Sequence, residues 1–227
     1  NKIASKIDHH LKNIGFLIVT NHGIKSNIIK NISLVLNSFF NKDQKFKNKF
    51  MAPYKGYPYG YFKTESEALA KSKGLDTPPD LKESFNGGPL KTPKGKISKD
   101  ALDFCYLPTI WPDVDDFENS WKIYYNEMEN LSKRLMSVFA IALKLPSDYF
   151  TKFIDNPISA LRALNYPLIQ KKVLPNQQRA GAHTDYGSLT ILLPLDSIQG
   201  LQIKNSNNRW VNVPNNQYRR SYGSLDK

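Results

Sequence analysis

Apolar residues recur at three- and four-residue steps in three stretches of the chain, a spacing that places them on one face of a helix. The first stretch covers residues 3–14, the second begins at Ser26, which is suited to an N-cap, and the third runs from Trp121 to Leu145. The third is long, and its apolar face includes Trp121, Tyr124, Met128, Leu131, Leu135, Val138, Ala142 and Leu145. These patterns predict three amphipathic helices, of which the third packs on a sheet.

Strand patterns dominate after residue 158. Apolar and β-branched runs bounded by turn residues predict strands at 160–166, 182–194, 200–204 and 209–213, and one earlier strand is predicted at 15–21. Helices first and strands later is an α+β order, consistent with a double-stranded β-helix, or jelly roll, buttressed by the long helix. We expect an N-terminal helical region over residues 1–115 and a partial jelly-roll core with the long helix over 116–227.

Composition is that of a globular protein. The chain has 227 residues, of which 40% are hydrophobic and 12% aromatic, so it can bury a substantial core. It contains no apolar run near the roughly 20 residues that span a bilayer, and its first residues lack the order of a signal peptide. The single cysteine, Cys105, suits a reducing compartment. We therefore expect a cytoplasmic protein without a membrane partner.

The net charge of +12 raises the question of nucleic-acid binding. Lysines are spread along the whole chain, and their densest run, residues 42–49, contains Phe46 as its only aromatic residue. A solvated basic surface is the interpretation we favour over a nucleic-acid partner, and such a surface would also favour an anionic substrate.

The candidate chemistry lies in residues 181–193, GAHTDYGSLTILL. Side chains two residues apart on a strand point to the same face, so His183 and Asp185 would project together if this segment is extended. An imidazole and a carboxylate, completed by a second histidine, form the facial triad of non-haem iron(II) oxygenases. A His-x-Asp tripeptide alone is weak support, because a histidine that is simply hydrogen-bonded near a strand end is common.

Three further blocks precede this one in order: residues 15–24 (GFLIVTNHGI), 80–85 (DLKESF) and 161–167 (LRALNYP). With the His183 block they resemble the iron(II)- and 2-oxoglutarate-dependent dioxygenases of the isopenicillin N synthase-like group. The resemblance implies a jelly roll, an enzyme that uses Fe(II) and 2-oxoglutarate as co-substrate, and oxidation of a small organic molecule by oxygen with release of succinate and carbon dioxide. It also implies that His183 and Asp185 bind the metal and that Tyr166, with Asn165 as a weaker candidate, contacts the co-substrate. No catalytic residue beyond the metal ligands is implied. An oxidase that uses iron but not 2-oxoglutarate, as isopenicillin N synthase does, is the alternative within this fold.

The chain departs from the family pattern after residue 186. Residues 186–227 contain no histidine to serve as the third ligand, and Arg219-Arg220-Ser221 matches the family's Arg-x-Ser clamp only in letters, because it follows Asp185 too closely. We therefore expect a fragment or an altered C-terminus in which the last jelly-roll strands are missing. A catalytically inactive binding module of the same fold remains the alternative from a different class of function. The sequence does not indicate an oligomeric state.

Overall fold

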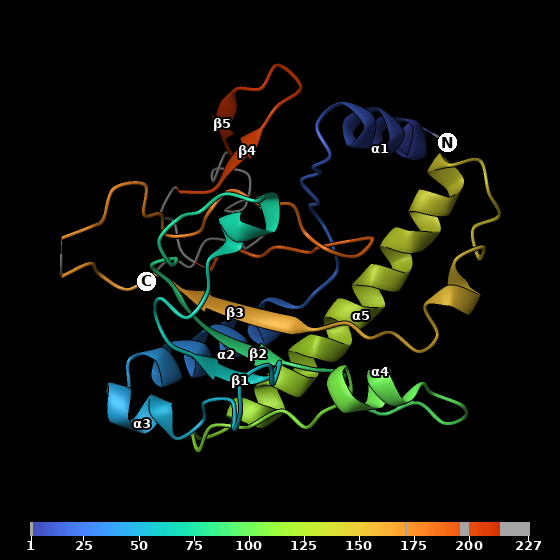
Figure 1. The fold of residues 1–227 in the computed structure, drawn as a ribbon. Helices are drawn as coiled ribbons and strands as arrows, with labels where there is room; N and C mark the ends of the chain where they lie inside the picture. Colours follow the sequence, from blue (N-terminus) through green and yellow to red (C-terminus); the bar gives the residue numbers. More distant parts are fainter. Residues whose placement is uncertain (1, 171, 196–199, 214–227) are drawn as a thin grey trace. The chain divides into compact units, whose positions relative to one another are not determined.

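The computed structural model describes residues 2–170, 172–195 and 200–213, and contains both helices and antiparallel strands (Figure 1). Its elements are α1 (Lys2–Asn13), α2 (Ser26–Phe40), α3 (Gln44–Asn48), β1 (Gly60–Phe62), η1 (Leu69–Lys73), β2 (Glu83–Gly87), α4 (Lys99–Phe104), α5 (Phe117–Ala142), η2 (Thr151–Phe153), β3 (Leu161–Asn165), β4 (Gln202–Lys204) and β5 (Trp210–Asn212). The chain forms two compact units. One comprises residues 1–30, 126–155 and 191–227, and the other comprises residues 31–125 and 156–190.

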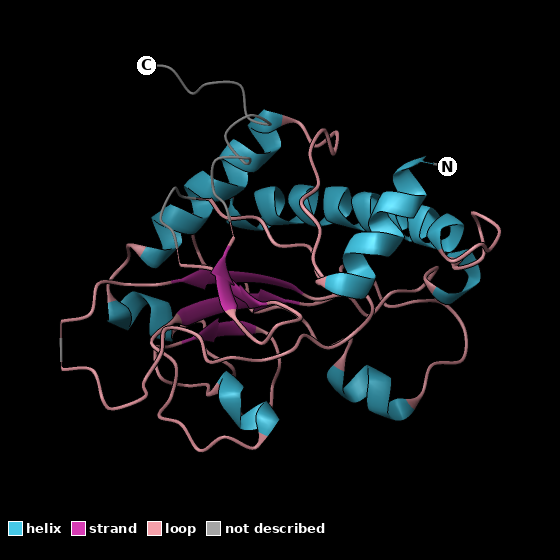
Figure 2. Cartoon of the chain, turned by 90° about the horizontal axis from the view of Figure 1, so that it is seen from above, coloured by secondary structure: helices cyan, strands magenta, loops and turns pink. Residues whose placement is uncertain are grey.

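The second unit is built on a three-stranded antiparallel sheet in the order β1-β2-β3 (Figures 1 and 2). Phe85 of the central strand lies opposite Tyr61 on one side and Ala163 on the other. Because side chains alternate between the faces of a strand, odd-numbered residues of β2 and β3 share one face and even-numbered residues share the other. The odd-numbered face carries the core, and the even-numbered face carries Arg162 and the polar groups around it.

Aromatic side chains fill the core of this unit. Phe39 of α2, Phe85 of β2, and Phe117 and Trp121 of α5 are all 0% exposed. The ring centroid of Phe85 lies 5.0 Å from that of Phe117 and 5.1 Å from that of Trp121, both edge to face. Such pairs add to the free energy gained by burying apolar area. The start of α5 and the end of α2 are thereby fixed to one face of the sheet.

A buried ion pair lies at the edge of this core. Nζ of Lys47 is 2.8 Å from Oε2 of Glu83, and both side chains are almost completely buried. The same carboxylate accepts hydrogen bonds from the Tyr61 hydroxyl and, at 2.7 Å, from the Asn165 amide. Buried charges require compensating partners. Here the partners come from α3 and from all three strands, so the cluster joins these elements.

The tyrosine-rich segment before and within β1 belongs to this core and does not line an open pocket. Tyr57, Tyr59 and Tyr61 are each at most 8% exposed. The hydroxyl of Tyr57 donates to the Pro108 carbonyl, and that of Tyr59 donates to the Cys105 carbonyl at 2.6 Å. Burial and these hydrogen bonds place the three tyrosines at the edge of the core.

Gly88 should not tolerate a side chain, because a methyl group there would lie 2.4 Å from the ring of the buried Tyr59. Gly88→Ala is expected to lower the free energy of unfolding by roughly 1–3 kcal/mol, the usual cost of overpacking. Urea denaturation measures this change. Gly200→Ala is the control, since a methyl group at that glycine meets nothing within 4 Å; equal denaturation midpoints for the two variants would contradict the prediction.

The prediction of a long amphipathic helix is confirmed by α5, which runs continuously through residues 117–142 and buries Trp121, Tyr124 and Leu131 of the expected face. The expected helices at 3–14 and from Ser26 are confirmed by α1 and α2. In the first unit, Arg134 of α5 donates to the His22 carbonyl at 3.0 Å. The strands expected at 200–204 and 209–213 form the hairpin β4-β5, in which Ile203 lies opposite Val211.

Two strand predictions are wrong. Residues 15–21 and 182–194 have no strand conformation in the structure. Left-handed backbone at Asn21 and at Gly187 interrupts the two segments. A strand is stabilised by a hydrogen-bonded neighbour, and among the described residues neither segment pairs with one. Apolar runs thus identified the two segments without determining their backbone conformation.

Candidate functional site

His183 and Asp185 lie close together, although the segment that carries them is not a strand. Nε2 of His183 is 3.3 Å from Oδ1 of Asp185. The side chains are 34% and 51% exposed, so solvent and small ligands can reach both. The expectation that the two residues converge therefore agrees with the geometry, but the argument from strand alternation was wrong. Irregular backbone brings the side chains together.

The backbone of the same segment orients the His183 ring. Nδ1 of His183 lies 2.7 Å from the Gly181 carbonyl oxygen, which can only accept a hydrogen bond. Nδ1 therefore carries the proton in the neutral ring, which leaves Nε2, the nitrogen 3.3 Å from Asp185, with a lone pair that could bind a metal. Metal-binding histidines are commonly oriented in this way, with one nitrogen donating to a backbone carbonyl.

The two side chains fit a metal ion in chemistry and spacing. Ligands that each lie about 2.0–2.2 Å from one ion at adjacent positions are separated by about 3 Å, close to the distance observed here. Among residues 2–170, 172–195 and 200–213, no group of three His, Cys, Asp or Glu side chains is gathered as a metal site. His183 and Asp185 stay a predicted pair of metal ligands, with an imidazole nitrogen and a carboxylate oxygen 3.3 Å apart. Arg219, Arg220 and Ser221 lie outside the described residues.

Tyr166 follows β3 directly and is 44% exposed. Burial of its hydroxyl raises the pKa of Tyr166, and the nearby Asp80 carboxylate raises it further, while Arg162 and Arg179 act in the opposite direction. The hydroxyl is therefore a protonated hydrogen-bond donor at neutral pH. Its surroundings contain the guanidinium groups of Arg162 and Arg179 as well as the Asp80 carboxylate, so charges of both signs lie nearby.

Asn165 lies opposite Glu83 in the sheet and donates its amide to that buried carboxylate. This places Asn165 on the face of the sheet that carries the core, whereas Arg162 lies on the other face with Asn86. The structure thus gives Asn165 a structural partner. Its assignment as a co-substrate contact stays a prediction.

A chain of ion pairs covers the even-numbered face of the sheet. Arg162 pairs with Glu67 and donates to Asn86 at 3.0 Å, while Nζ of Lys82 lies 2.6 Å from the other oxygen of Glu67. Lys82 is also 3.7 Å from Asp80. Two cations and two carboxylates therefore compensate one another, so Arg162 is engaged within the protein.

The Glu67 carboxylate should make stability depend on acid pH. Burial raises its pKa, but hydrogen bonds and charge from Arg162 and Lys82 outweigh burial and hold the pKa below its ordinary value of 4.5. A group with a depressed folded pKa stabilises the fold above its unfolded pKa, and this stabilisation is lost as pH falls through the folded pKa. Wild type should therefore be more stable than Glu67→Gln at pH 7, and the difference should disappear on acidification. Denaturation of both proteins from about pH 7 to pH 3 measures this; a constant difference would contradict it.

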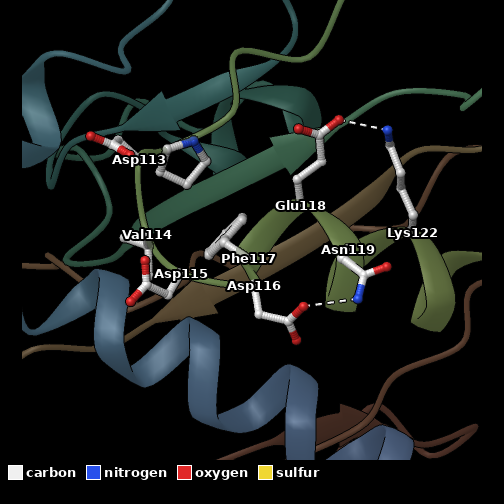
Figure 3. Close-up of a pocket in the computed structure, with 9 residues that line it drawn as sticks. Asp113, Val114, Asp115, Asp116, Phe117, Glu118, Asn119 and Lys122 are labelled. Atoms are coloured by element: carbon white, nitrogen blue, oxygen red, sulfur yellow. Dashed lines mark hydrogen bonds and ion pairs between the residues drawn. The ribbon is translucent and has the colours of Figure 1, made fainter.

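A hollow before α5 is lined by acidic residues that have structural roles (Figure 3). Asp116 accepts hydrogen bonds from Ser120 and Asn119, which lower the pKa of its carboxyl group, and Glu118 pairs with Lys122. Carboxylates at the start of a helix are stabilised by its unpaired N–H groups. These residues therefore hold the beginning of α5.

Models of known families match two parts of the chain. Residues 1–114 match the model for the N-terminal region of non-haem dioxygenases in morphine synthesis, and residues 158–224 match that of the 2OG-Fe(II) oxygenase superfamily. The chain belongs to this oxygenase superfamily. The resemblance to iron(II)- and 2-oxoglutarate-dependent dioxygenases, inferred from the four sequence blocks, is thereby confirmed at the level of the superfamily.

Individual relatives are similar over nearly the whole chain. Proline hydroxylase buaE of Petromyces alliaceus is 30% identical over 86% of this chain and 58% of its own length. A homoarginine-6-hydroxylase of Oryza sativa subsp. japonica is 29% identical over 92% of this chain and 63% of its own. This superfamily member thus spans about 60% of these relatives' length.

Solved structures confirm the expected fold class. A full-length Neurospora crassa protein crystallised with alpha-KG and thymine superposes with a TM-score of 0.76 at 26% identity, covering 93% of this chain and 64% of the other. A 2OG-Fe(II) oxygenase family protein from Caulobacter crescentus gives a TM-score of 0.75 at 26% identity, covering 94% and 66%. The α+β fold class, with helices and antiparallel sheets, is thus shared with 2OG-Fe(II) oxygenases.

Sequence reasoning missed the contribution of Asp80. The residue was noticed only as part of a family block, without a role, yet its carboxylate accepts a hydrogen bond from the Gly181 amide at 2.9 Å, two residues before His183. No local pattern could indicate this, since the two residues are 101 positions apart. A charged residue within an otherwise buried run was the one available signal.

Proposed function

We propose that this chain forms part of a 2-oxoglutarate-dependent iron(II) oxygenase and that His183 and Asp185 are two of its metal ligands. The observation that carries the proposal is the 3.3 Å approach of Nε2 and Oδ1 in a chain of this superfamily, with Nδ1 of the ring engaged by a backbone carbonyl. An oriented imidazole beside an accessible carboxylate is the arrangement that the facial triad requires.

When bound, iron(II) would let molecular oxygen react with 2-oxoglutarate: one oxygen atom would enter succinate, carbon dioxide would leave, and the other oxygen atom would be available to oxidise the substrate. The residues of this chain hold and orient the reactants. The protonated Tyr166 hydroxyl, near Arg162 and Arg179, would donate a hydrogen bond to an anionic oxygen of the co-substrate. Asn165 is a second candidate contact, subordinate to Tyr166 because Glu83 already accepts from its amide.

The proposed substrate is a small organic molecule. Support comes from the relatives, among them a proline hydroxylase and a homoarginine-6-hydroxylase, both of which bear the names of small-molecule enzymes. Oxygen and 2-oxoglutarate are the proposed co-substrates. Assignment to the isopenicillin N synthase-like group belongs to the same proposal.

A cytoplasmic setting without a nucleic-acid partner is also proposed, on the basis of the single cysteine and the dispersed lysines. Among the residues that the structure describes, no helix has the combination of length and apolar character needed to cross a membrane.

Anaerobic titration with ferrous iron and 2-oxoglutarate tests the function. Chelation of the metal by the keto acid should produce a weak visible charge-transfer band, and succinate formation should be coupled to oxygen uptake. A flat spectrum at full metal loading would count against the proposal. Oxygen uptake without succinate would indicate an oxidase of the same fold.

A further inference from the structure

Asp80 is a buried carboxylate whose two oxygens hold separate parts of the backbone. The residue is 2% exposed. Oδ1 accepts from the Gly181 amide at 2.9 Å, and Oδ2 accepts from the Leu69 amide at 3.1 Å. Lys82, at 3.7 Å, provides a compensating charge. A carboxylate forms stronger hydrogen bonds with amides than a neutral acceptor does, so both backbone segments are firmly fixed.

Gly181 is confined as well as hydrogen-bonded. A side chain at this position would lie 2.9 Å from the Cβ and the backbone nitrogen of Ala70, and 3.3 Å from Oδ1 of Asp80. The backbone around Gly181 therefore packs directly on η1 and on Asp80. Space is the reason for glycine here, because Gly181 is not among the glycines with a positive φ.

The carbonyl of the same residue accepts the hydrogen bond from Nδ1 of His183 at 2.7 Å. A continuous path thus runs from the Asp80 carboxylate through the Gly181 residue to the His183 ring. Two neighbouring hydrogen bonds strengthen the attachment of this segment to residues 79–81. The backbone N–H of Leu81 donates to the Gln178 carbonyl at 2.9 Å, and the side-chain amide of Gln177 donates to the Pro79 carbonyl at 3.0 Å.

We infer that Asp80 is a positioning residue for His183. By fixing Gly181, it sets the tautomer and the direction of the imidazole, so that Nε2 is presented beside Asp185 before any metal arrives. The inference rests on the proposed function for the meaning of that geometry. Asp80 lies in the N-terminal dioxygenase region. That region therefore takes a direct part in forming the site in residues 158–224.

The test compares Asp80→Ala and Asp80→Asn with Glu67→Gln in the whole 227-residue chain. Glu67→Gln is a matched control because it disturbs the same ion-pair chain through Lys82 and Arg162 without touching Gly181. Asp80→Asn keeps the volume and one acceptor oxygen, so it serves where Asp80→Ala does not fold. In Asp80→Asn the side-chain NH2 group would face the backbone N–H of either Gly181 or Leu69. Because two donors cannot bond to each other, the hold on the backbone should still be weaker.

The first readout is the ring nitrogen chemical shifts of His183 in the metal-free protein, measured at the same mildly alkaline pH for every variant. Wild type and Glu67→Gln should show a single tautomer protonated at Nδ1, and both Asp80 variants should show a mixture. This readout does not depend on metal binding. An unchanged tautomer in both folded Asp80 variants would overturn the inference.

The second readout is affinity for Co(II), a spectroscopic probe that occupies iron(II) sites. Loss of groups that orient a metal-binding histidine weakens metal binding roughly 10–100-fold, and that decrease is expected for Asp80→Ala but not for Glu67→Gln. Wild-type affinity in the Asp80 variants would also contradict the inference. If wild type itself fails to bind Co(II), the proposed metal site fails, while the tautomer measurement still decides the role of Asp80.

Discussion

Replacing Glu83 with alanine should lower the free energy of unfolding by roughly 3–5 kcal/mol, the usual cost of removing one partner of a buried ion pair. The substitution leaves the Lys47 ammonium group buried without its carboxylate and removes the acceptor of the Tyr61 and Asn165 hydrogen bonds. Domains of this kind are stable by about 5–15 kcal/mol, so the variant should be close to unfolding at room temperature.

Urea denaturation followed by circular dichroism measures the loss. Asp103→Ala, which removes a carboxylate from the exposed pair Lys99–Asp103, should leave the denaturation midpoint unchanged. The double variant Lys47→Met with Glu83→Gln should recover part of the loss because no unpaired charge remains. If Glu83→Ala were as stable as Asp103→Ala, the ion pair would not have the importance inferred here.

The helices could be predicted from sequence because their signal is local. The apolar face of α5 repeats over seven turns, and burial of Trp121, Tyr124 and Leu131 agrees with the expected side. The strand expected at 182–194 failed for the opposite reason. Strand formation depends on a partner elsewhere in the chain, and an apolar run such as residues 189–193 contains no information about that partner.

The candidate site was predictable to the same extent. His183 and Asp185 could be identified because two residue types at short spacing suffice to indicate metal chemistry. The long-range contacts of the fold could not be predicted in this way. The Asp80 carboxylate binds the Gly181 amide 101 positions away, and the Glu83 carboxylate pairs with Lys47 36 positions away. Even the block DLKESF, identified by resemblance, gave no indication that Lys82 and Glu83 would face opposite sides of the sheet toward different partners. Alternation along β2 explains that division once the strand is known.

Asp185→Ala should produce the largest functional effect, because it removes a proposed metal ligand and leaves the fold in place. The side chain is 51% exposed and lies beside His183, so little packing is lost. Changes to groups that only orient a ligand weaken metal binding roughly 10–100-fold, and loss of the ligand itself should exceed that range. We therefore expect Co(II) and iron(II) binding to fall below detection, together with succinate formation where wild type supports it.

Calorimetric titration of Co(II) into the wild type and the variant measures the effect, and thermal unfolding of the metal-free proteins provides the check on folding. Asp76→Ala is a suitable control, since Asp76 is an exposed carboxylate in the same unit. It should retain wild-type affinity. A ligand that contributes to the site through its charge cannot be replaced by a methyl group. Equal metal affinities of Asp185→Ala and Asp76→Ala would therefore refute the assignment of Asp185 as a ligand. They would also refute the interpretation of the His183–Asp185 pair as a metal site.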